Sequence, residues 1–227
     1  EESIEVDGLG LGILPGKNGF VQADGSVKLN PSYLPPFIMA RFANAWADDP
    51  RWAHVYLASQ RLLLDSGKTG SYPDWVLYNN GQLSLPEDEP RGDYDAIRNY
   101  MWIGMSHKAD PVANSLLKQL SPTVALLLRR QAMPEWFEPG SGRASAKAGP
   151  AGFQAAVAPF AMAAGATDLA KKLSTKALRS AKQEDWLAYG YYNGALSLFA
   201  QGYMDQLYRF GPQGELLPRG KEVAACE

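Results

Sequence analysis

The residues best suited to chemistry lie in the segment 92–102, which reads GDYDAIRNYMW and places two carboxylates and an arginine before an apolar stretch. If a helix begins near Asp93, the side chains of Asp95 and Arg98 lie one turn apart on one face. Free N–H groups and the helix dipole stabilise an ionised carboxylate at a helix N-terminus, and a general base must be ionised. Spacing alone nevertheless favours a structural interpretation, in which both aspartates cap the helix and Arg98 is their solvated partner.

The rest of the chain predicts a mainly α-helical protein in which polar loops join successive helices into antiparallel hairpins. The pairs Asp49-Pro50 and Asp110-Pro111 are typical helix starts, because aspartate caps a helix and proline is tolerated in its first turn. We expect helices over 37–47, from Asp49 to Gly67, from Asp93, from Asp110 with a division at Pro122, over 153–163 with a kink or interruption at Pro159, over 167–182 and over 191–210.

The connections between these helices contain little predicted β-structure. The Gly-rich opening through Leu29 is expected to be irregular apart from a short β-hairpin near the start of the chain, between 20–22 and 27–29. The segments 71–91 and 133–149 are rich in Pro, Gly and polar residues and are expected to be loops.

Composition excludes several classes of function. The chain has 227 residues and a net charge of −2 with acids and bases interspersed, so no nucleic-acid partner is expected. No apolar run reaches the length that spans a bilayer, so no membrane insertion is expected. One cysteine, Cys226, and two histidines, His54 and His107, do not make a zinc pattern, and we expect neither a metal nor an organic cofactor.

Further motifs stand in a characteristic order along the chain: GLG at 8–10, NPSYLPP at 30–36, QRLLL at 60–64, PDWV at 73–76, GPAGF at 149–153, YYN at 191–193 and GELLP at 214–218. With the segment 92–102 in its place among them, the chain resembles glycoside hydrolase family 8 nearly from end to end. Within that family it is most similar to the enzymes of bacterial cellulose-synthesis operons.

The resemblance implies an inverting endo-β-1,4-glucanase that hydrolyses cellulose-like β-1,4-glucan chains. It also implies a periplasmic or secreted enzyme of bacterial cellulose synthesis, with the cellulose synthase complex as a further candidate partner. Two alternatives stay open from the sequence. One is a xylanase or chitosanase of the same family, and the other is a non-catalytic glycan-binding or assembly fragment.

The fold that the resemblance implies is an (α/α)6 barrel (toroid), of which residues 1–227 supply the later helical hairpins as the C-terminal part of one catalytic domain. The family's glutamate general acid and Ala-Ser-Asp motif belong to an N-terminal half that is not in this sequence. We therefore expect that half as a partner, unpaired apolar faces on the helices of Asp95 and Tyr191, and a lost partner for Cys226. Should the chain act alone, its acid would be one of the loop glutamates Glu87, Glu89, Glu135 and Glu138.

The same resemblance assigns roles to residues around the segment 92–102. Asp95 matches the general base that takes a proton from the attacking water, with Asp93 as the competing carboxylate, interpreted as the helix N-cap. Tyr33 matches a tyrosine that positions this water, and without the resemblance it would be interpreted as a buried tyrosine. Tyr94 is expected to line the same subsite, and Arg98 to contact the base or sugar hydroxyls.

Four more residues are expected to bind the substrate. Tyr191, Tyr192 and Asn193 match a segment near the substrate, where either stacking of a tyrosine on a glucose ring or packing in the core explains the aromatic pair. Trp75 follows Asp74 in a loop, where aromatic side chains can form the wall of a cleft.

Overall fold

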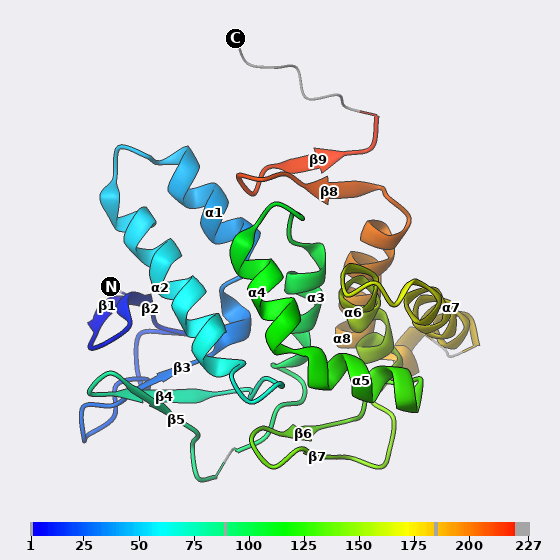
Figure 1. The fold of residues 1–227 in the computed structure, drawn as a ribbon, viewed down its shortest axis with the longest axis horizontal. Helices are drawn as coiled ribbons and strands as arrows, with labels where there is room; N and C mark the ends of the chain where they lie inside the picture. The colour runs from blue at the N-terminus through cyan, green and yellow to red at the C-terminus, as the bar shows by residue number, and fades with distance from the viewer. Residues whose placement is uncertain (1, 89, 184–185, 221–227) are drawn as a thin grey trace.

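The computed structural model describes residues 2–88, 90–183 and 186–220, which form mainly helices (Figure 1). The helices are the 3₁₀ turn η1 (Pro31–Tyr33), α1 (Pro36–Ala45), α2 (Pro50–Ser66), α3 (Ile97–Met105), α4 (Pro111–Gln119), α5 (Ser121–Arg130), α6 (Ala151–Ala163), α7 (Thr167–Gln183) and α8 (Trp186–Met204). Their order confirms the helical pattern predicted from the sequence.

The predicted helix starts are confirmed at both Asp-Pro pairs. The Asp49 carboxylate accepts from the Arg51 N–H (3.1 Å), and the Asp110 carboxylate accepts from the Val112 N–H (2.9 Å). Pro122 stands in the first turn of α5, where it separates α5 from α4 as predicted. Of the kink or interruption predicted at Pro159, the interruption does not occur, because α6 continues through it. Contacts with α3, α7 and α8 bury α6 and hold it together despite the lost hydrogen bond.

Short antiparallel strands connect the helices. They are β1 (Ser3–Val6) with β2 (Gly10–Ile13), β3 (Val27–Leu29) with β4 (Val76–Asn79) and β5 (Gln82–Ser84), β6 (Phe137–Glu138) with β7 (Arg143–Ala144), and β8 (Tyr208–Phe210) with β9 (Leu216–Pro218). In the three-stranded sheet Leu29 is paired with Val76, so the end of β3 lies beside the start of β4. This register brings residues 30–33 next to residues 73–75.

These strands correct several expectations. The predicted hairpin between 20–22 and 27–29 is present as a bridge between Val21 and Val27, but β3 pairs chiefly with β4, inside the segment expected to be a loop. The segment 133–149 contains β6 and β7, and the predicted helix 191–210 ends at Met204 and is followed by β8. Such strands of two to four residues are too short to show a periodicity in sequence.

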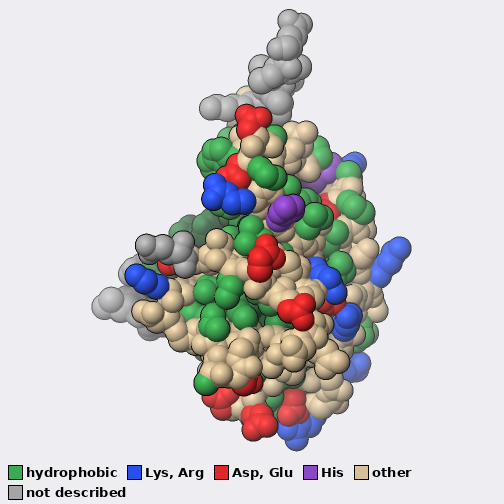
Figure 2. All heavy atoms as spheres, turned by 90° about the vertical axis from the view of Figure 1, so that its left-hand side faces the viewer, with side chains coloured by type: hydrophobic (Ala, Val, Ile, Leu, Met, Phe, Trp, Pro, Cys, Tyr) green, Lys and Arg blue, Asp and Glu red, His purple; other side chains and the backbone are tan. Residues whose placement is uncertain are grey.

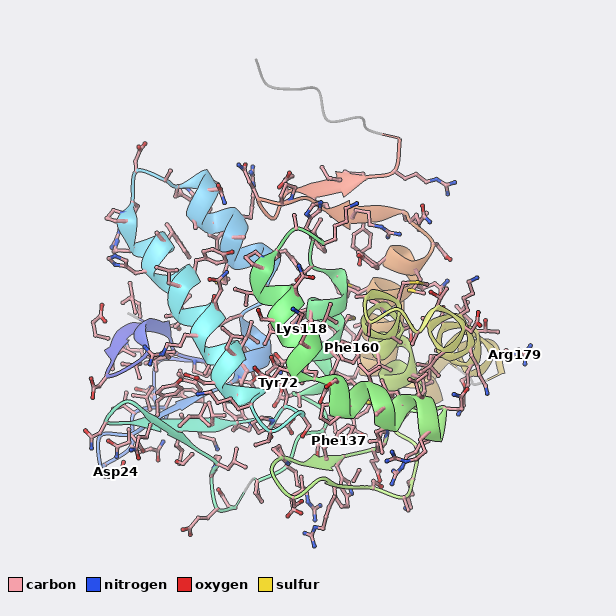
Figure 3. The ribbon with its side chains drawn as sticks, in the orientation of Figure 1. Asp24, Tyr72, Lys118, Phe137, Phe160 and Arg179 are labelled. Carbon is pink, nitrogen blue, oxygen red and sulfur yellow. The ribbon has the colours of Figure 1, made fainter. Side chains whose placement is uncertain are left out.

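The main core of the molecule surrounds α3. Ile97, Met101 and Met105 form the predicted apolar stripe and are each at most 1% exposed. At Gly104 an added Cβ would collide with the backbone of Pro159 and Phe160, so the absence of a side chain allows α3 and α6 to pack closely. Figure 3 shows Phe160 in the interior between the helices, whereas Asp24 and Arg179 lie at opposite edges of the view.

A second core lies between α2, β2 and the sheet of β3 and β4. Its members include Val6, Leu29, Leu62, Val76 and Tyr78. Figure 2 turns this side of the molecule toward the viewer and shows acidic, basic and apolar side chains interspersed over it. The second core matters for function because it fixes the β3–β4 pair, from which two of the loops around the candidate site emerge.

An apolar stripe on α8 faces solvent. Tyr191 is 87% exposed, Leu198 72% and Phe199 54%, and together with Tyr208 they line a groove of about 490 Å³. The expected unpaired apolar face is therefore present on the helix of Tyr191. The same expectation is wrong for the helix of Asp95, because α6, α4 and α1 cover the apolar stripe of α3.

Over the described ranges, no helix combines the length and the apolar character needed to cross a membrane.

Candidate active site

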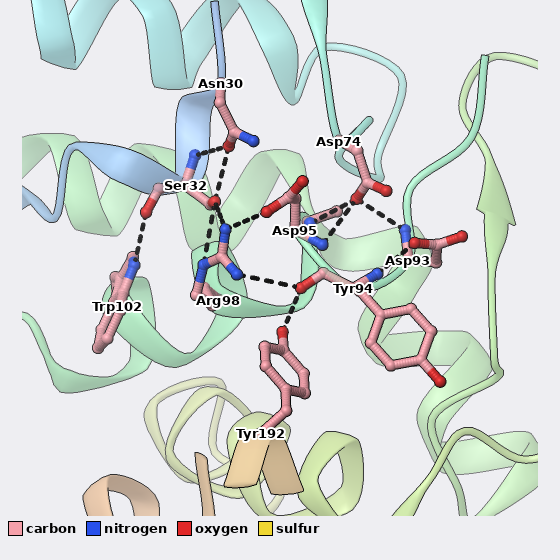
Figure 4. Close-up of polar contacts among 10 residues, drawn as sticks. Asn30, Ser32, Asp74, Asp93, Tyr94, Asp95, Arg98, Trp102 and Tyr192 are labelled. Atoms are coloured by element: carbon pink, nitrogen blue, oxygen red, sulfur yellow. Dashed lines mark hydrogen bonds and ion pairs between the residues drawn. The ribbon is translucent and has the colours of Figure 1, made fainter. Parts of the chain in front are cut away.

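The candidate site is built on the turn Asp93–Ala96, which leads into α3 (Figure 4). One carboxylate oxygen of Asp74, Oδ1, accepts from the N–H groups of Asp93 (2.8 Å), Asp95 (3.1 Å) and Ala96 (2.6 Å). N–H groups at the start of a helix have no partner within the helix, so a side chain from elsewhere satisfies three of them here. The interpretation of Asp93 as the N-cap is therefore wrong: Asp74 is the capping side chain, and α3 begins at Ile97.

Residue 92 must be glycine for this turn to lie where it does. Gly92 exchanges two backbone hydrogen bonds with Phe137 (2.9 and 2.8 Å), and the Asp74 N–H donates to the Arg91 carbonyl oxygen (2.9 Å). A Cβ at Gly92 would collide with the carbonyl oxygen of Tyr72. The chain before Asp95 is thus fixed between two neighbouring backbone segments.

Asp95 and Arg98 form the ion pair predicted from their spacing. The Arg98 Nη2 group donates to Asp95 Oδ1, and the two side chains are 25% exposed for Asp95 and 20% for Arg98. Arg98 also donates through Nε (3.2 Å) and Nη2 (2.8 Å) to the hydroxyl oxygen of Ser32. That hydroxyl group donates in turn to Asn30 Oδ1 (2.7 Å). The Asp95 carboxylate is therefore held by the hydrogen-bond network of Arg98, Ser32 and Asn30 and remains partly exposed to solvent.

Tyr33 and Trp75 form one aromatic wall beside this pair. Their ring centroids are 5.9 Å apart, Trp75 stacks on Phe20, and the Arg98 guanidinium lies 5.5 Å from the centre of the Tyr33 ring. Tyr33 is 47% exposed, so the interpretation as a buried tyrosine is wrong. Its partial burial and the negative charge of Asp95 raise the pKa of the Tyr33 hydroxyl, which therefore stays protonated at neutral pH.

Tyr94 and Tyr192 form a second aromatic pair at the site. Their ring centroids are 5.6 Å apart, and the Tyr94 ring packs on the edge of Phe153 at 5.1 Å. The Tyr192 hydroxyl donates to the Tyr94 carbonyl oxygen, which also accepts from Arg98 Nη1 (3.3 Å). Burial raises the pKa of Tyr192 to about 12, against the opposing effect of the Arg98 guanidinium. This contact links α8 to the turn that carries Asp95.

A recess of about 480 Å³ opens beside the turn. It is lined by Asp74, Trp75, Asp88, Pro90, Arg91, Asp93, Asp95 and Glu138. Its carboxylates differ in their electrostatic surroundings. Burial and a hydrogen bond with the Asp93 carboxyl raise the pKa of Asp74 to about 7, whereas bonds from Arg143 and Ser141 lower the pKa of Glu138. Among the described residues, no group of three or more side chains is arranged to hold a metal ion.

The structure brings together most of the residues predicted for the site. Asp95, Arg98, Tyr33, Tyr94, Tyr192 and Trp75 lie around the turn and its recess.

The other two predicted residues lie elsewhere. The Asn193 side-chain oxygen accepts from the Gly152 N–H (3.0 Å), so it joins α8 to α6. Tyr191 lies in the exposed stripe of α8, which contradicts a place for it in the core.

Sequence reasoning missed the residues that hold the site. Asp74, Ser32 and Asn30 each make several of its hydrogen bonds, yet they lie 21 or more positions from Asp95 in the sequence. The one local signal was the pattern Asn30-Pro31-Ser32, in which the Asn30 side chain accepts from the Ser32 N–H (3.0 Å) and caps η1. An acidic residue in a loop gives no comparable sign of which distant turn it caps.

In chemical terms, the site offers an accessible carboxylate with a fixed orientation, a protonated phenol beside it and aromatic rings on both sides. A carboxylate of this kind can accept a proton from a water molecule. Aromatic faces with polar neighbours suit sugar rings, whose faces are apolar and whose edges carry hydroxyl groups.

Comparison with known proteins identifies relatives along nearly the whole chain. A family model described as "Glycosyl hydrolases family 8" matches residues 1–206. An endoglucanase of Xanthomonas axonopodis pv. citri (strain 306) is 37% identical over 227 residues, which are 100% of this chain and 58% of that relative. An endoglucanase of Escherichia coli (strain K12) is 37% identical over 229 residues, covering 99% of this chain and 58% of the relative. The chain thus spans about 58% of the length of these relatives.

Solved structures share the fold. The endo-1,4-D-glucanase from Vibrio fischeri ES114 superposes with a TM-score of 0.85 at 33% identity, covering 96% of this chain and 62% of that one. A family 8 endo-β-1,4-glucanase from an Achatina fulica gut metagenomic library has a TM-score of 0.63 at 23% identity, covering 89% of this chain and 58% of that one. The second likeness concerns the fold alone.

Ser32→Ala tests the network that holds Arg98. The substitution removes a hydroxyl that accepts from the guanidinium and donates to Asn30, and a hydrogen bond to a charged group is worth about 1.5–3 kcal/mol. We therefore expect the free energy of unfolding to fall by about 1–3 kcal/mol, measured by urea unfolding. Ser115→Ala, which removes an exposed hydroxyl on α4, is the matched control and should change little. Equal stability of Ser32→Ala and the wild type would contradict a holding role for Ser32.

Proposed function

This chain belongs to glycosyl hydrolases family 8, and on that premise we propose that it is the C-terminal part of an inverting endo-β-1,4-glucanase that hydrolyses cellulose-like β-1,4-glucan. As a member of this family it supplies part of an (α/α)6 barrel. The observation that carries the proposal is the carboxylate of Asp95, which is fixed by Arg98, partly exposed, and next to the Tyr33 phenol.

In the proposed mechanism Asp95 is the general base. A water molecule held by Tyr33 and Asp95 attacks the anomeric carbon and passes a proton to the Asp95 carboxylate. The bond from this carbon to the glycosidic oxygen breaks, and a carboxylic acid on the opposite face of the sugar protonates the leaving oxygen. The ion pair with Arg98 keeps the Asp95 carboxylate oriented before the water arrives.

The general acid is proposed to lie outside this chain. A general acid must be protonated at the working pH, and hydrogen bonds from Arg143 keep Glu138, the glutamate in the recess, ionised instead. Among the other candidates, Glu135 accepts from Ser145 (3.5 Å), Glu87 is exposed, and Glu89 lies outside the described residues. None of the described glutamates thus combines a place in the recess with an environment that favours the acid form.

Substrate contacts are proposed for the aromatic side chains around the turn. Trp75 with Tyr33 on one side, and Tyr94 with Tyr192 on the other, offer ring faces or edges to glucose units. Arg98 is proposed to orient the base and not to act as a free sugar ligand, because its donors already serve Asp95, Ser32 and the Tyr94 carbonyl. Tyr191 and Asn193 are not assigned to subsites on this geometry.

The N-terminal part of the enzyme is proposed to cover the exposed stripe of α8. The relatives are longer than this chain, which spans about 58% of their length, and large apolar patches on soluble proteins mark interfaces. The association with bacterial cellulose synthesis, the cellulose synthase complex as a partner, and a periplasmic or secreted location are part of the same proposal and rest on the sequence resemblance. Cys226, for which a lost partner was expected, lies outside the described residues.

Asp95→Asn in the full-length enzyme tests the base. The amide cannot take a proton from water, so kcat on soluble cellulose derivatives should fall by about 10²–10⁴-fold while oligosaccharide binding persists. Asp93→Asn is the matched control, because Asp93 lies two residues away in the same recess. Reducing-sugar release measures turnover and calorimetry measures binding. Near-normal turnover in Asp95→Asn together with a large loss in Asp93→Asn would move the base to Asp93.

The stereochemistry of the product tests the inverting mechanism. If Asp95 activates water, and does not itself attack, the first product of a β-linked oligosaccharide carries the α configuration at its new reducing end. Proton NMR in the first minutes, before mutarotation, distinguishes the two anomers. An initial β product would instead assign Asp95 the role of a nucleophile.

Assembly in trans tests the partner of α8. With Tyr191, Leu198 and Phe199 exposed, residues 1–227 expressed alone should self-associate on size exclusion and lack activity, and adding the N-terminal part should restore a soluble, active complex. Leu198→Glu should weaken that complex, whereas Leu57→Glu, at a 61% exposed position on α2, should not. A monodisperse and active protein of these 227 residues would contradict the proposal.

A further inference from the structure

We propose that Asp74 is a positioning residue for the general base, because its carboxyl group holds the turn that carries Asp95 at the distance and orientation that proton transfer from water requires. This inference rests on the proposed function of Asp95 as the base. It assigns a catalytic consequence to a residue that neither donates nor accepts the reacting proton.

Several hydrogen bonds of the turn converge on one atom of Asp74. Asp74 Oδ1 accepts from three N–H groups of the turn, at 2.6 to 3.1 Å, and one of them is the backbone N–H of Asp95 itself. Because these N–H groups precede the regular part of α3, the helix offers them no carbonyl partner. Without the Asp74 oxygen the turn would lose the contacts that fix its backbone, and the Asp95 side chain would move with it.

The two side chains that hold Asp95 in place, Asp74 and Ser32, come from the ends of one pair of strands. Asp74 lies just before β4 and Ser32 lies just after β3, and these strands are paired through Leu29 and Val76, which are each at most 1% exposed. Ser32 fixes Arg98 and hence the Asp95 carboxylate, while Asp74 fixes the Asp95 backbone. The β3–β4 pair therefore positions both the backbone and the side chain of Asp95.

The protonation state of Asp74 also suits a positioning role. Burial and the neighbouring Asp93 carboxyl group raise the pKa of Asp74 to about 7, so Asp74 keeps its proton in weakly acidic solution. The charged and titratable groups around it are Asp93 and Asp95 on the turn, Asp88, Arg91 and Glu138 in the recess, Tyr100 on α3 and Tyr192 on α8. A neutral Asp74 can thus hold the turn without placing another negative charge beside Asp95.

A protonated carboxyl group and a carboxamide have the same shape and the same pattern of one acceptor and one donor toward the turn and Asp93. Asp74→Asn in the full-length enzyme should therefore keep kcat close to the wild-type value at pH 6. Asp74→Ala removes the acceptor, and we expect kcat to fall by about 10- to 100-fold with little change in KM, because the base is misplaced while the aromatic walls remain.

The pH dependence separates positioning from a purely structural role. Above pH 7 Asp74 ionises and its charge repels the carboxylates of Asp93 and Asp95, so the ratio of kcat for Asp74→Asn to kcat for the wild type should rise between pH 6 and pH 8.

The stability of Asp74→Asn relative to the wild type should change in the same direction as this ratio. A raised pKa in the folded state contributes stability at low pH that is lost as the pH rises through about 7. The Tm of Asp74→Asn relative to the wild type should therefore increase over this range.

Asp110→Ala is the matched control. The Asp110 carboxylate also accepts from two N–H groups at a helix start, Val112 (2.9 Å) and Ala113 (3.3 Å), but that helix is α4, whose residues do not line the recess. This variant should lower the Tm and leave kcat unchanged at temperatures where it is folded.

The outcomes distinguish this inference from the proposed function. If Asp95→Asn is inactive but folded Asp74→Ala has wild-type kcat, or if Asp74→Asn loses as much kcat as Asp74→Ala, the positioning role is overturned while Asp95 remains the base. If Asp95→Asn keeps its activity, the proposed function fails and the positioning role fails with it.

Discussion

The arrangement of the site depends on the ion pair between Asp95 and Arg98 at the entry to α3. An ion pair on an exposed helix surface contributes little, because water and salt screen it and its side chains lose entropy when they are held. Here the guanidinium is only 20% exposed and is bonded to the Ser32 hydroxyl, which is itself bonded to Asn30. The geometry of the pair is therefore set by the protein interior, and the carboxylate keeps one orientation toward the recess.

The segments that carry this ion pair are closely packed against their neighbours. α3 is buried along its length and approaches α6 so closely that Gly104 cannot carry a side chain, and Gly92 meets the same restriction against Tyr72. Close-packed interiors transmit displacements, because side chains have few voids into which they can relax. The turn of Asp95 is thus located by the main core through α3 and by the second core through the β3–β4 pair. On the side of α8, the turn is held by Tyr192, whose hydroxyl donates to the Tyr94 carbonyl oxygen.

Much of the fold follows from local signals in the sequence. The Asp-Pro pairs at Asp49 and Asp110 mark helix starts, and the spacing of Ile97, Met101 and Met105 marks the buried side of α3, because these effects act within one or two turns. The spacing of Asp95 and Arg98 likewise predicts their ion pair. Pro159 shows the limit of such rules, since tertiary packing of α6 outweighs a local preference.

The non-local part of the site could not be predicted in this way. Which distant carboxylate caps the turn is decided by the pairing of β3 with β4, and strands of three and four residues carry too little pattern to specify a partner. The prediction of Asp93 as the cap was wrong for that reason, and Ser32 was recognised only as part of a motif. The residues that surround Asp95 came together in the prediction through family resemblance, because the contact of Tyr33 with Trp75 and that of Tyr192 with Tyr94 join segments far apart in the sequence.

The central claim is that Asp95 and Tyr33 hold the water that attacks the glycosidic bond. A crystal structure of the full-length Asp95→Asn enzyme with a bound cello-oligosaccharide tests it most directly. We expect an ordered water molecule within hydrogen-bonding distance of residue 95 and of the Tyr33 hydroxyl, on the face of the anomeric carbon opposite the leaving oxygen. A scissile bond bound far from residue 95, or a water held at this face by Asp93 alone, would contradict the claim.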